Sequence, residues 1–378
     1  MAEDNLLTRF DWRLTFLGDV VLYAVFLLSG TNWFLALVLT EALFWLVRLV
    51  WLSPMMLRFI LRRLMHMIPI VLAVVAIGFG LIQLAPGDIF SQMRLNPNLR
   101  AEDLERFRQN FGLDLPWYEQ FFRYLWRAIV YQDLGWSQTF RAPVMTLVSQ
   151  RAGATVLLAL TSLMLAWGFS IPAGIIAATK QYKWQDQVVS VFAFFGLAIP
   201  NFFLAFLLLY VISTLGLPIP IGGMTSPNFQ ELGPIAQIFD IGHHLILPVV
   251  VIGTSAMASL TRIMRANMLE IMNQQYVVTA RAKGQAENVV VYKHALRNAI
   301  NPMITILGFQ LGNIMGGAAL VEQVIAWPGL GNLILTAIIQ QDLYLVVGSL
   351  VYGVVLLVIG NLIADILLAV VDPRVRIG

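Results

Sequence analysis

The residues best suited to binding another protein form one polar segment, Gln275–Pro302, between two long apolar stretches. Its first half has a helix pattern that breaks at Gly284, and a second helix pattern follows and stops at Pro302. Ala280 stands four residues before Gly284, so the two share one face of a helix. Small side chains let another protein's surface approach the backbone closely. A glycine hinge in an ordinary basic loop between membrane helices is the alternative interpretation.

The composition of the whole chain indicates a membrane protein. The chain is 59% hydrophobic and 12% charged, with a mean hydropathy of +0.77, whereas a soluble domain carries about 25% charged residues. The net charge of +3 is dispersed among apolar segments, so no nucleic-acid partner is predicted. Cysteine is absent from the sequence, which excludes disulfides and thiolate chemistry.

Apolar runs of about 20 residues, the length that crosses a bilayer as a helix, recur along the chain. We predict an all-α membrane protein with a six-helix core. The six segments lie near Ile60–Leu84, Val156–Ala178, Val188–Leu215, Leu245–Met264, Met303–Leu320 and Tyr344–Val370.

Residues 1–55 form an extension before this core. They contain two shorter apolar runs joined by Ser29–Asn32, and this spacing favours an extra N-terminal helical hairpin. The alternative is that one or both runs lie along the bilayer surface, because Asp19 and Arg48 are costly in lipid unless paired or snorkelled.

The distribution of Lys and Arg in short loops predicts the orientation. The loops Gly216–Gly242 and Glu322–Leu343 contain neither residue type, and the expected helix count places both on one side. All the lysines fall in two loops on the other side: Lys180, Lys183, Lys283 and Lys293. We therefore expect both termini, and the polar segment, to be cytoplasmic.

The long stretch of residues 87–150 is then extracytoplasmic. It mixes Arg with Asp and Glu, which long translocated loops tolerate. Helical patterns at Ala101–Phe111 and Trp117–Ile129 predict a small external helical segment after the first core helix.

The polar segment resembles the cytoplasmic coupling loop of bacterial ABC importer permeases. The match rests on Thr279-Ala-Arg-Ala-Lys-Gly284, His294-Ala-Leu-Arg-Asn-Ala299 and Pro302, which most resemble the dipeptide/oligopeptide branch of these binding-protein-dependent transport components. Other short motifs follow in the family's order between Met56 and Gly378: Leu84-Ala-Pro-Gly-Asp88, Asp133-Leu-Gly-Trp-Ser137, Ile199-Pro200, Thr261-Arg-Ile-Met-Arg265, Pro328-Gly-Leu-Gly331 and Asp372-Pro-Arg374.

The resemblance implies a permease domain over residues 56–378, with its coupling loop at 270–302, in the bacterial plasma (inner) membrane. It implies an ATP-driven importer in which this chain forms half of the pathway for peptides or a similar small solute. Sister systems carry nickel, glutathione or oligosaccharides. The implied partners are a second homologous permease, two cytoplasmic ATPase subunits, an extracytoplasmic solute-binding protein and the lipid bilayer.

The same resemblance assigns roles within the polar segment. It implies ATPase docking by the residues around the glycine break: Thr279, Ala280, Arg281, Ala282, Lys283, Gly284 and Glu287. It implies support of the loop by His294, Arg297 and Pro302.

Chemistry within the chain itself is sparse. The sequence has no Gly-x-x-x-x-Gly-Lys-Ser/Thr loop, no His-Glu-x-x-His motif and no nucleophile elbow, so we expect no catalytic residue, cofactor or metal. ATP hydrolysis would then belong to partner subunits. Asp365 is the one acid expected inside a core helix, with a structural partner favoured over a proton relay. A self-sufficient channel or ion-coupled secondary transporter is the alternative function, and a membrane-anchored assembly or sensor protein is another.

Overall fold

The computed structural model describes residues 54–84, 115–304, 306–307, 310 and 319–371. The chain divides into two compact units, residues 1–66 with 373–378 and residues 67–372. The first unit is described only from residue 54, where helix α3 (Pro54–Leu84) begins before it continues into the second. The hairpin expected before the core and the helix expected at Ala101–Phe111 fall outside the described residues.

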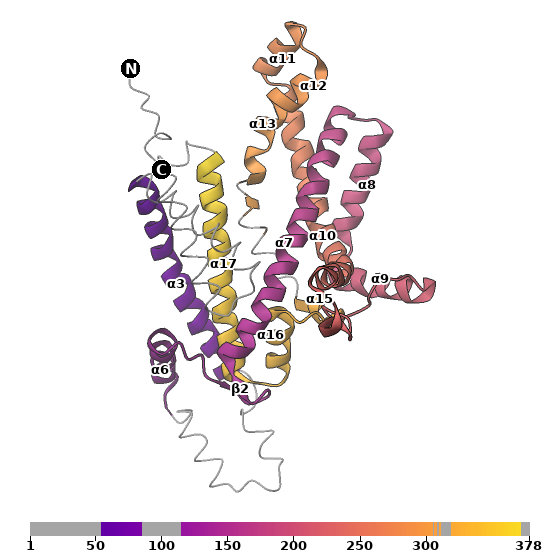
Figure 1. Ribbon diagram of the computed structural model, residues 1–378. Helices are drawn as coiled ribbons and strands as arrows, with labels where there is room; N and C mark the ends of the chain where they lie inside the picture. The colour runs from indigo at the N-terminus through magenta and orange to yellow at the C-terminus, as the bar shows by residue number, and fades with distance from the viewer. Residues whose placement is uncertain (1–53, 85–114, 305, 308–309, 311–318, 372–378) are drawn as a thin grey trace. The chain divides into compact units, whose positions relative to one another are not determined.

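The described part of the second unit is predominantly helical (Figure 1). The expected helix at Trp117–Ile129 is confirmed as α6. Two-residue strands β1 and β2 pair antiparallel, with Trp136 opposite Pro143. The elements after α3 are α6 (Trp117–Val130), β1 (Trp136–Ser137), β2 (Ala142–Pro143), α7 (Val144–Thr179), α8 (Trp184–Ala198), α9 (Asn201–Leu215), η2 (Phe229–Glu231), α10 (Pro234–Met272), α11 (Gln275–Ala282), α12 (Glu287–Val289), η3 (Val290–Ala295), α13 (Leu296–Ala299), α15 (Ala319–Val324), α16 (Leu330–Ile339) and α17 (Leu343–Val371).

Three of the described helices are long and apolar enough to cross a bilayer: α7, α10 and the Leu343–Leu362 part of α17. The bent pair α8 and α9 makes a fourth candidate if it is taken as one span. In α3 the described apolar stretch is the shorter Ile68–Gly78. The expected segment Met303–Leu320 lies partly outside the described residues.

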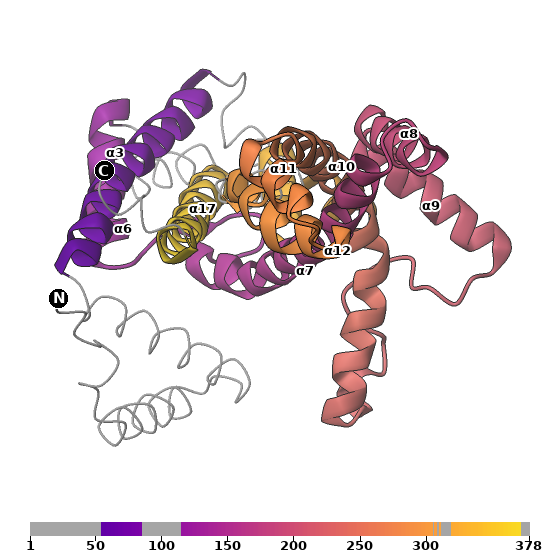
Figure 2. The same cartoon turned by 90° about the horizontal axis from the view of Figure 1, so that it is seen from above.

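The segment expected as one helix over Val188–Leu215 is two helices bent by 105°. The break is at Ile199 and Pro200, which have extended ψ angles of 121° and 138°. Proline has no N–H to continue a helix and disfavours helical geometry in the residue before it. As a result, α9 runs crosswise to α8 (Figures 1 and 2).

The loop expected over Glu322–Leu343 contains a helix, α16, that the sequence analysis missed. Its 10 residues are too few to span a bilayer, so a search for long apolar runs does not find it. It is held by packing instead, because Leu330, Leu333 and Ala337 are buried in a cluster with Val144 and Leu345.

The core of the second unit is organised around close contact between α7 and α10. A Cβ atom added to Gly174 in α7 would lie 2.6 Å from the Cβ atom of Met264 in α10, so the two backbones approach as closely as glycine allows. Gly196 in α8 makes a similar approach to Ala258, at 2.9 Å. Small residues at these crossings are typical of packed membrane helices.

Candidate functional site

The break in the polar segment is a left-handed turn at Gly284. Its φ angle is +73°, a value that side chains other than glycine rarely adopt. The N–H of Gly284 donates to the carbonyl of Arg281 (2.9 Å) and the N–H of Gln285 to that of Ala280 (3.4 Å). This pair of bonds is the Schellman pattern that ends α11. The sequence prediction of a break at this position is confirmed.

The polar segment has two arms, α11 before Gly284 and residues 287–299 after it. An ion pair across the turn joins them. Arg281 donates from Nη2 to Oε1 of Glu287 (2.7 Å) and from Nε to Oε2 (3.2 Å). These hydrogen bonds lower the pKa of the Glu287 carboxyl, so the pair is charged at neutral pH. Nearby, His294 Nε2 lies 2.7 Å from the side-chain oxygen of Gln285. The turn is therefore shaped by side chains as well as by glycine.

Most residues that the sequence assigned to ATPase docking are exposed around this turn, namely Thr279, Arg281, Ala282, Lys283, Gly284 and Glu287. Ala280 differs because it is buried with Val277 and Val290, which come from the two arms. Its small side chain permits contact between the arms of the segment itself.

The segment also exposes apolar side chains that were not predicted to have a role: Tyr276, Val278, Val289 and Tyr292. Their positions in a polar stretch could have flagged them.

The second arm packs along α10. Val291, Ala295 and Ala299 are buried in one cluster with Met264 and Met268 of α10. The six residues Val290–Ala295 form a π-helix, a rare conformation that is frequent at functional sites.

Polar contacts fix the same arm at its end. Asn267 of α10 donates from Nδ2 to the carbonyl of Ala299 (3.2 Å), and Asn298 donates to the Tyr276 hydroxyl (2.9 Å). Among the residues expected to support the segment, His294 is half-buried, whereas Arg297 and Pro302 are exposed. The helical pattern does not stop at Pro302, because a turn at Ile300 is followed by helix over residues 301–304.

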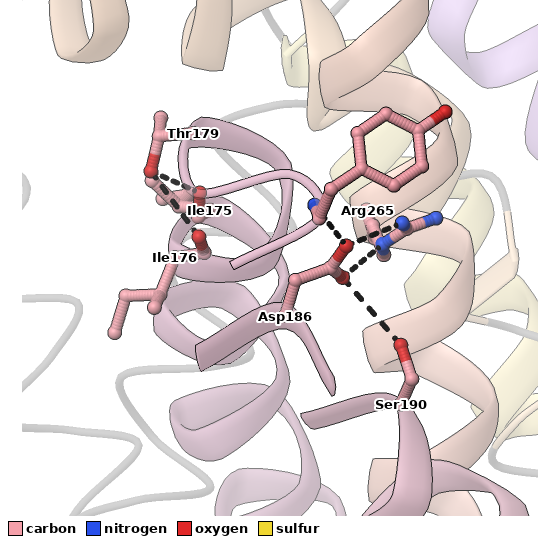
Figure 3. A network of polar contacts seen from close by, with 7 residues as sticks. Ile175, Ile176, Thr179, Asp186, Ser190 and Arg265 are labelled. Atoms are coloured by element: carbon pink, nitrogen blue, oxygen red, sulfur yellow. Dashed lines mark hydrogen bonds and ion pairs between the residues drawn. The ribbon is translucent and has the colours of Figure 1, made fainter. Parts of the chain in front are cut away.

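A second ion pair ties α10 to α8 (Figure 3). Arg265 donates from Nε to Oδ1 of Asp186 (2.6 Å) and from Nη2 to Oδ2 (2.8 Å). Asp186 also accepts from the Tyr182 backbone N–H at 3.0 Å and is almost fully buried. Arg265 belongs to one of the motifs named above, whereas Asp186 was not predicted to have a role. Its position at the start of an apolar helix was the available indication.

A buried carboxylate organises the chain around the motif Pro328-Gly-Leu-Gly331. Glu322 accepts hydrogen bonds from the backbone N–H of Asn332 (2.9 Å) and from the Thr155 hydroxyl (3.2 Å). A Cβ atom at Gly329 would lie 2.2 Å from Glu322 Oε1, so glycine is required there for space. The motif, which leads into α16, therefore surrounds the carboxyl group of Glu322 in α15.

Metal-binding geometry is not formed by the described residues, in which no group of three or more His, Asp or Glu side chains gathers. His244 Nδ1 instead lies 2.8 Å from the carbonyl of Asp240, one turn earlier in α10. Asp365 lies within α17, but its side chain is outside the described set.

Two family models match consecutive parts of the chain. The model for the N-terminal part of binding-protein-dependent transport system membrane components matches residues 56–171. The model described as "Binding-protein-dependent transport system inner membrane component" matches residues 170–377. Residues 1–55 precede both matches, in agreement with the extension inferred from the sequence.

Similar proteins include the oligopeptide transport system permease protein AppB of Bacillus subtilis (strain 168), 42% identical over 318 residues, which are 84% of this chain and 98% of AppB. The glutathione transport system permease protein GsiC of Escherichia coli (strain K12) is 35% identical over 288 residues, 76% of this chain and 88% of GsiC. A chain of the inward-facing MetNI methionine ABC transporter aligns with a TM-score of 0.47 and 18% identity, over 60% of this chain and 97% of that chain.

Proposed function

We propose that this chain, which belongs to the family of inner-membrane components of binding-protein-dependent transport systems, imports peptides or similar small solutes as one permease of an ATP-driven complex. The chain is a multi-pass inner-membrane protein of the ABC permease type. Its relatives are an oligopeptide permease and a glutathione permease. These names support a peptide-like solute, in which a backbone amide is the shared chemical feature.

The observation that carries the proposal is the exposed glycine turn of the polar segment. Apart from its two chain neighbours, no atom of the described residues lies within 4 Å of a Cβ position at Gly284, so the turn leaves open space beside its backbone. Figure 1 shows α11 and α12 projecting past the ends of α7 and α8, where a partner can reach them. The basic residues Arg281 and Lys283 accompany the turn, and Val278 and Val289 add exposed apolar surface. This mixture suits a groove on a cytoplasmic ATPase subunit.

A displacement of the turn can be transmitted to the helix bundle through a continuous series of packed side chains. Val290 is buried against α11, and Val291, Ala295 and Ala299 are buried against α10. Arg265 of α10 then holds Asp186 of α8. Packed cores move as units rather than deform smoothly, so a shift of the segment is expected to displace α10 and α8 together.

The proposed assembly contains a second permease, two ATPase subunits and an extracytoplasmic solute-binding protein. This chain is its non-catalytic part, with ATP hydrolysis in the partner subunits. Both termini and the polar segment face the cytoplasm, as the lysine-containing loops predict. Alternating access follows as a shift between inward-facing and outward-facing populations that ATP drives.

The docking role is tested by substitution at Gly284. Gly284→Asp adds bulk and negative charge at the proposed contact, whereas Gly284→Asn adds the same bulk without charge. Both residue types tolerate a left-handed conformation better than most. We expect Gly284→Asp to retain less ATPase subunit in detergent pull-downs than Gly284→Asn, with normal membrane insertion of both. Unchanged ATPase retention and transport in both variants would remove Gly284 from the interface.

The source of energy separates the importer from a channel or ion-coupled carrier. Uptake into liposomes holding the full complex should require ATP and should survive collapse of the pH gradient. Asp365→Asn should alter assembly or stability more than coupling, because a lone carboxylate near a helix end mainly serves a local partner. Gradient-driven uptake by this chain without ATPase subunits would contradict the proposal.

A further inference from the structure

Helix α6 (Trp117–Val130) presents three chemically distinct sectors around its axis. The first faces the protein, where Tyr124 is buried in a cluster with Val144, Val148 and Leu345. Phe121, Leu125 and Ala128 are partly buried against the same cluster. At 100° per residue these four side chains occupy an arc of about 100°. Protein packing therefore accounts for only part of the apolar surface of α6.

The second sector is a stripe of exposed apolar side chains. Tyr118, Phe122, Trp126 and Ile129 are 48%, 65%, 63% and 73% exposed. Their spacing of four, four and three residues places them within an arc of about 80°, directly beside the buried sector. Three of the four are aromatic. An exposed apolar stripe of this size is unusual on a protein surface that contacts only water.

The third sector lies on the far side of the stripe and is mainly polar, apart from the last residue of the helix, Val130, which is 49% exposed. Arg123 and Arg127 are exposed there, and Glu119 lies at its margin. Arg127 forms an exposed ion pair with Asp133 in the loop that follows the helix. The order around α6 is thus protein, apolar surface and hydrated charge.

The position of α6 indicates what covers the stripe. The Tyr124 ring stacks with that of Tyr344 at a centroid distance of 6.5 Å, and Tyr344 is the second residue of α17. The same cluster holds Val144 and Val148, from the first two turns of α7. In Figure 1, α6 is seen end-on where α7 and α17 are seen from the side, so its axis lies crosswise to these spanning helices. It therefore sits at the level where they begin.

We propose that α6 is an interfacial helix that lays Phe122, Trp126 and Ile129 into the lipid bilayer beside the ends of α7 and α17. Aromatic side chains are enriched at this level of a membrane, and a helix lying in the interface has an apolar face in the acyl boundary and a charged face in water. Helix α3 contributes Val75 to the same buried cluster and also exposes an apolar side chain, Ile77. A soluble solute-binding protein is the competing occupant, and it is an outcome of the test.

The natural absence of cysteine in the chain allows single labels to be placed. Full-length Phe122→Cys, Ile129→Cys and Arg123→Cys chains would carry a nitroxide label. Each would be assembled into the complex, with partner-subunit cysteines replaced, in phosphatidylethanolamine–phosphatidylglycerol liposomes. Electron paramagnetic resonance then compares label collisions with oxygen, which concentrates in lipid, and with a water-soluble nickel chelate.

At positions 122 and 129 we expect a ratio of oxygen to nickel accessibility several-fold above that at position 123, with or without solute-binding protein. Ratios equal to that at position 123 overturn the proposal. So does protection at positions 122 and 129 that arises only when binding protein is added, because that result assigns the stripe to a protein partner.

A second measurement covers a cysteine variant that fails to assemble. In liposomes of brominated lipid, Trp126→Phe should remove a quenched component from the tryptophan fluorescence of the complex. An unchanged degree of quenching also overturns the proposal.

Discussion

The helix crossings at α10 and the polar segment both use a glycine and an acid–arginine pair, but for different purposes. Where α7 and α8 cross α10, Gly174 is needed for space and the pair Asp186–Arg265 is largely withdrawn from water, with side chains 6% and 29% exposed. In the polar segment, Gly284 is needed for its φ angle of +73°, and the pair Arg281–Glu287 is 37% and 59% exposed. The first region joins helices that are distant in sequence. The second shapes a local turn for a partner.

The energetic value of a glycine or of an ion pair therefore depends on its surroundings. Removing one partner of a buried pair leaves a charge without compensation, whereas an exposed pair competes with water and counter-ions. Replacing a glycine at a helix crossing causes steric overlap, whereas replacing a glycine in a left-handed turn causes backbone strain. Four substitutions, in decreasing order of predicted cost, test this contrast.

Asp186→Ala should be the most damaging change. The change leaves the Arg265 guanidinium without its carboxylate partner and removes the acceptor of the Tyr182 N–H. We therefore expect the free energy of unfolding to fall by about 3 kcal/mol. Thermal or denaturant unfolding of the solubilised full-length chain measures it. In a double-mutant cycle, Arg265→Met should cost much less when Asp186 is already Ala. Additive losses would show that the two side chains do not depend on each other.

Gly174→Ala should follow, with a cost of about 1–3 kcal/mol from overpacking. The new methyl group would overlap Met264 at its rigid Cβ atom, so α7 and α10 must separate. Gly168→Ala in the same helix is the matched control, because no described atom outside the adjacent helix backbone lies within 4 Å of its added Cβ atom. We expect the control to be neutral or slightly stabilising, since alanine favours helix. Equal effects of the two changes on unfolding would contradict the crossing.

Gly284→Ala should cost about 1–2 kcal/mol in local stability, through strain at a left-handed residue with open space around it. Gly284→Asn should cost less, because asparagine adopts this conformation more readily. Hydrogen exchange of the α11 amides measures the local effect. If Asn protects α11 as poorly as Ala does, the backbone angle is not what selects glycine.

Glu287→Ala should have the smallest effect, below about 1 kcal/mol, because the pair is exposed. Its pH dependence has a definite sign. The pKa of Glu287 is lowered by Arg281, so the pair stabilises the turn above the ordinary carboxyl pKa of about 4.3, and the contribution is lost as pH falls through the lowered value. Hydrogen exchange of the turn at pH 7 and at acid pH, in the wild type and in Glu287→Ala, should converge at acid pH. A difference that grows on acidification would refute the assignment.

Prediction from the sequence succeeded where a local pattern was sufficient. The helix at Trp117–Ile129 and the break at Gly284 each depend on residues within one or two turns. Prediction failed for two elements. The segment Val188–Leu215 was expected as one helix although the break at Pro200 has a local cause, and α16 was taken for a loop because it is short and is held by packing. The exposed set around Gly284 was largely anticipated, but the burial of Ala280 between two arms was not.

The membrane class, the family and the place of the glycine turn could be predicted from the sequence, because apolar run length, motif order and backbone propensity are evident from the residues along the chain. Which buried charged and polar side chains meet depends on helix packing and could not be predicted from the sequence. Asp186 meets Arg265 across 79 positions, and Glu322 meets Thr155 across 167. Such contacts exist only once α7, α8, α10 and α15 have packed, and the cost of burying a charged or polar group without a partner then selects one arrangement.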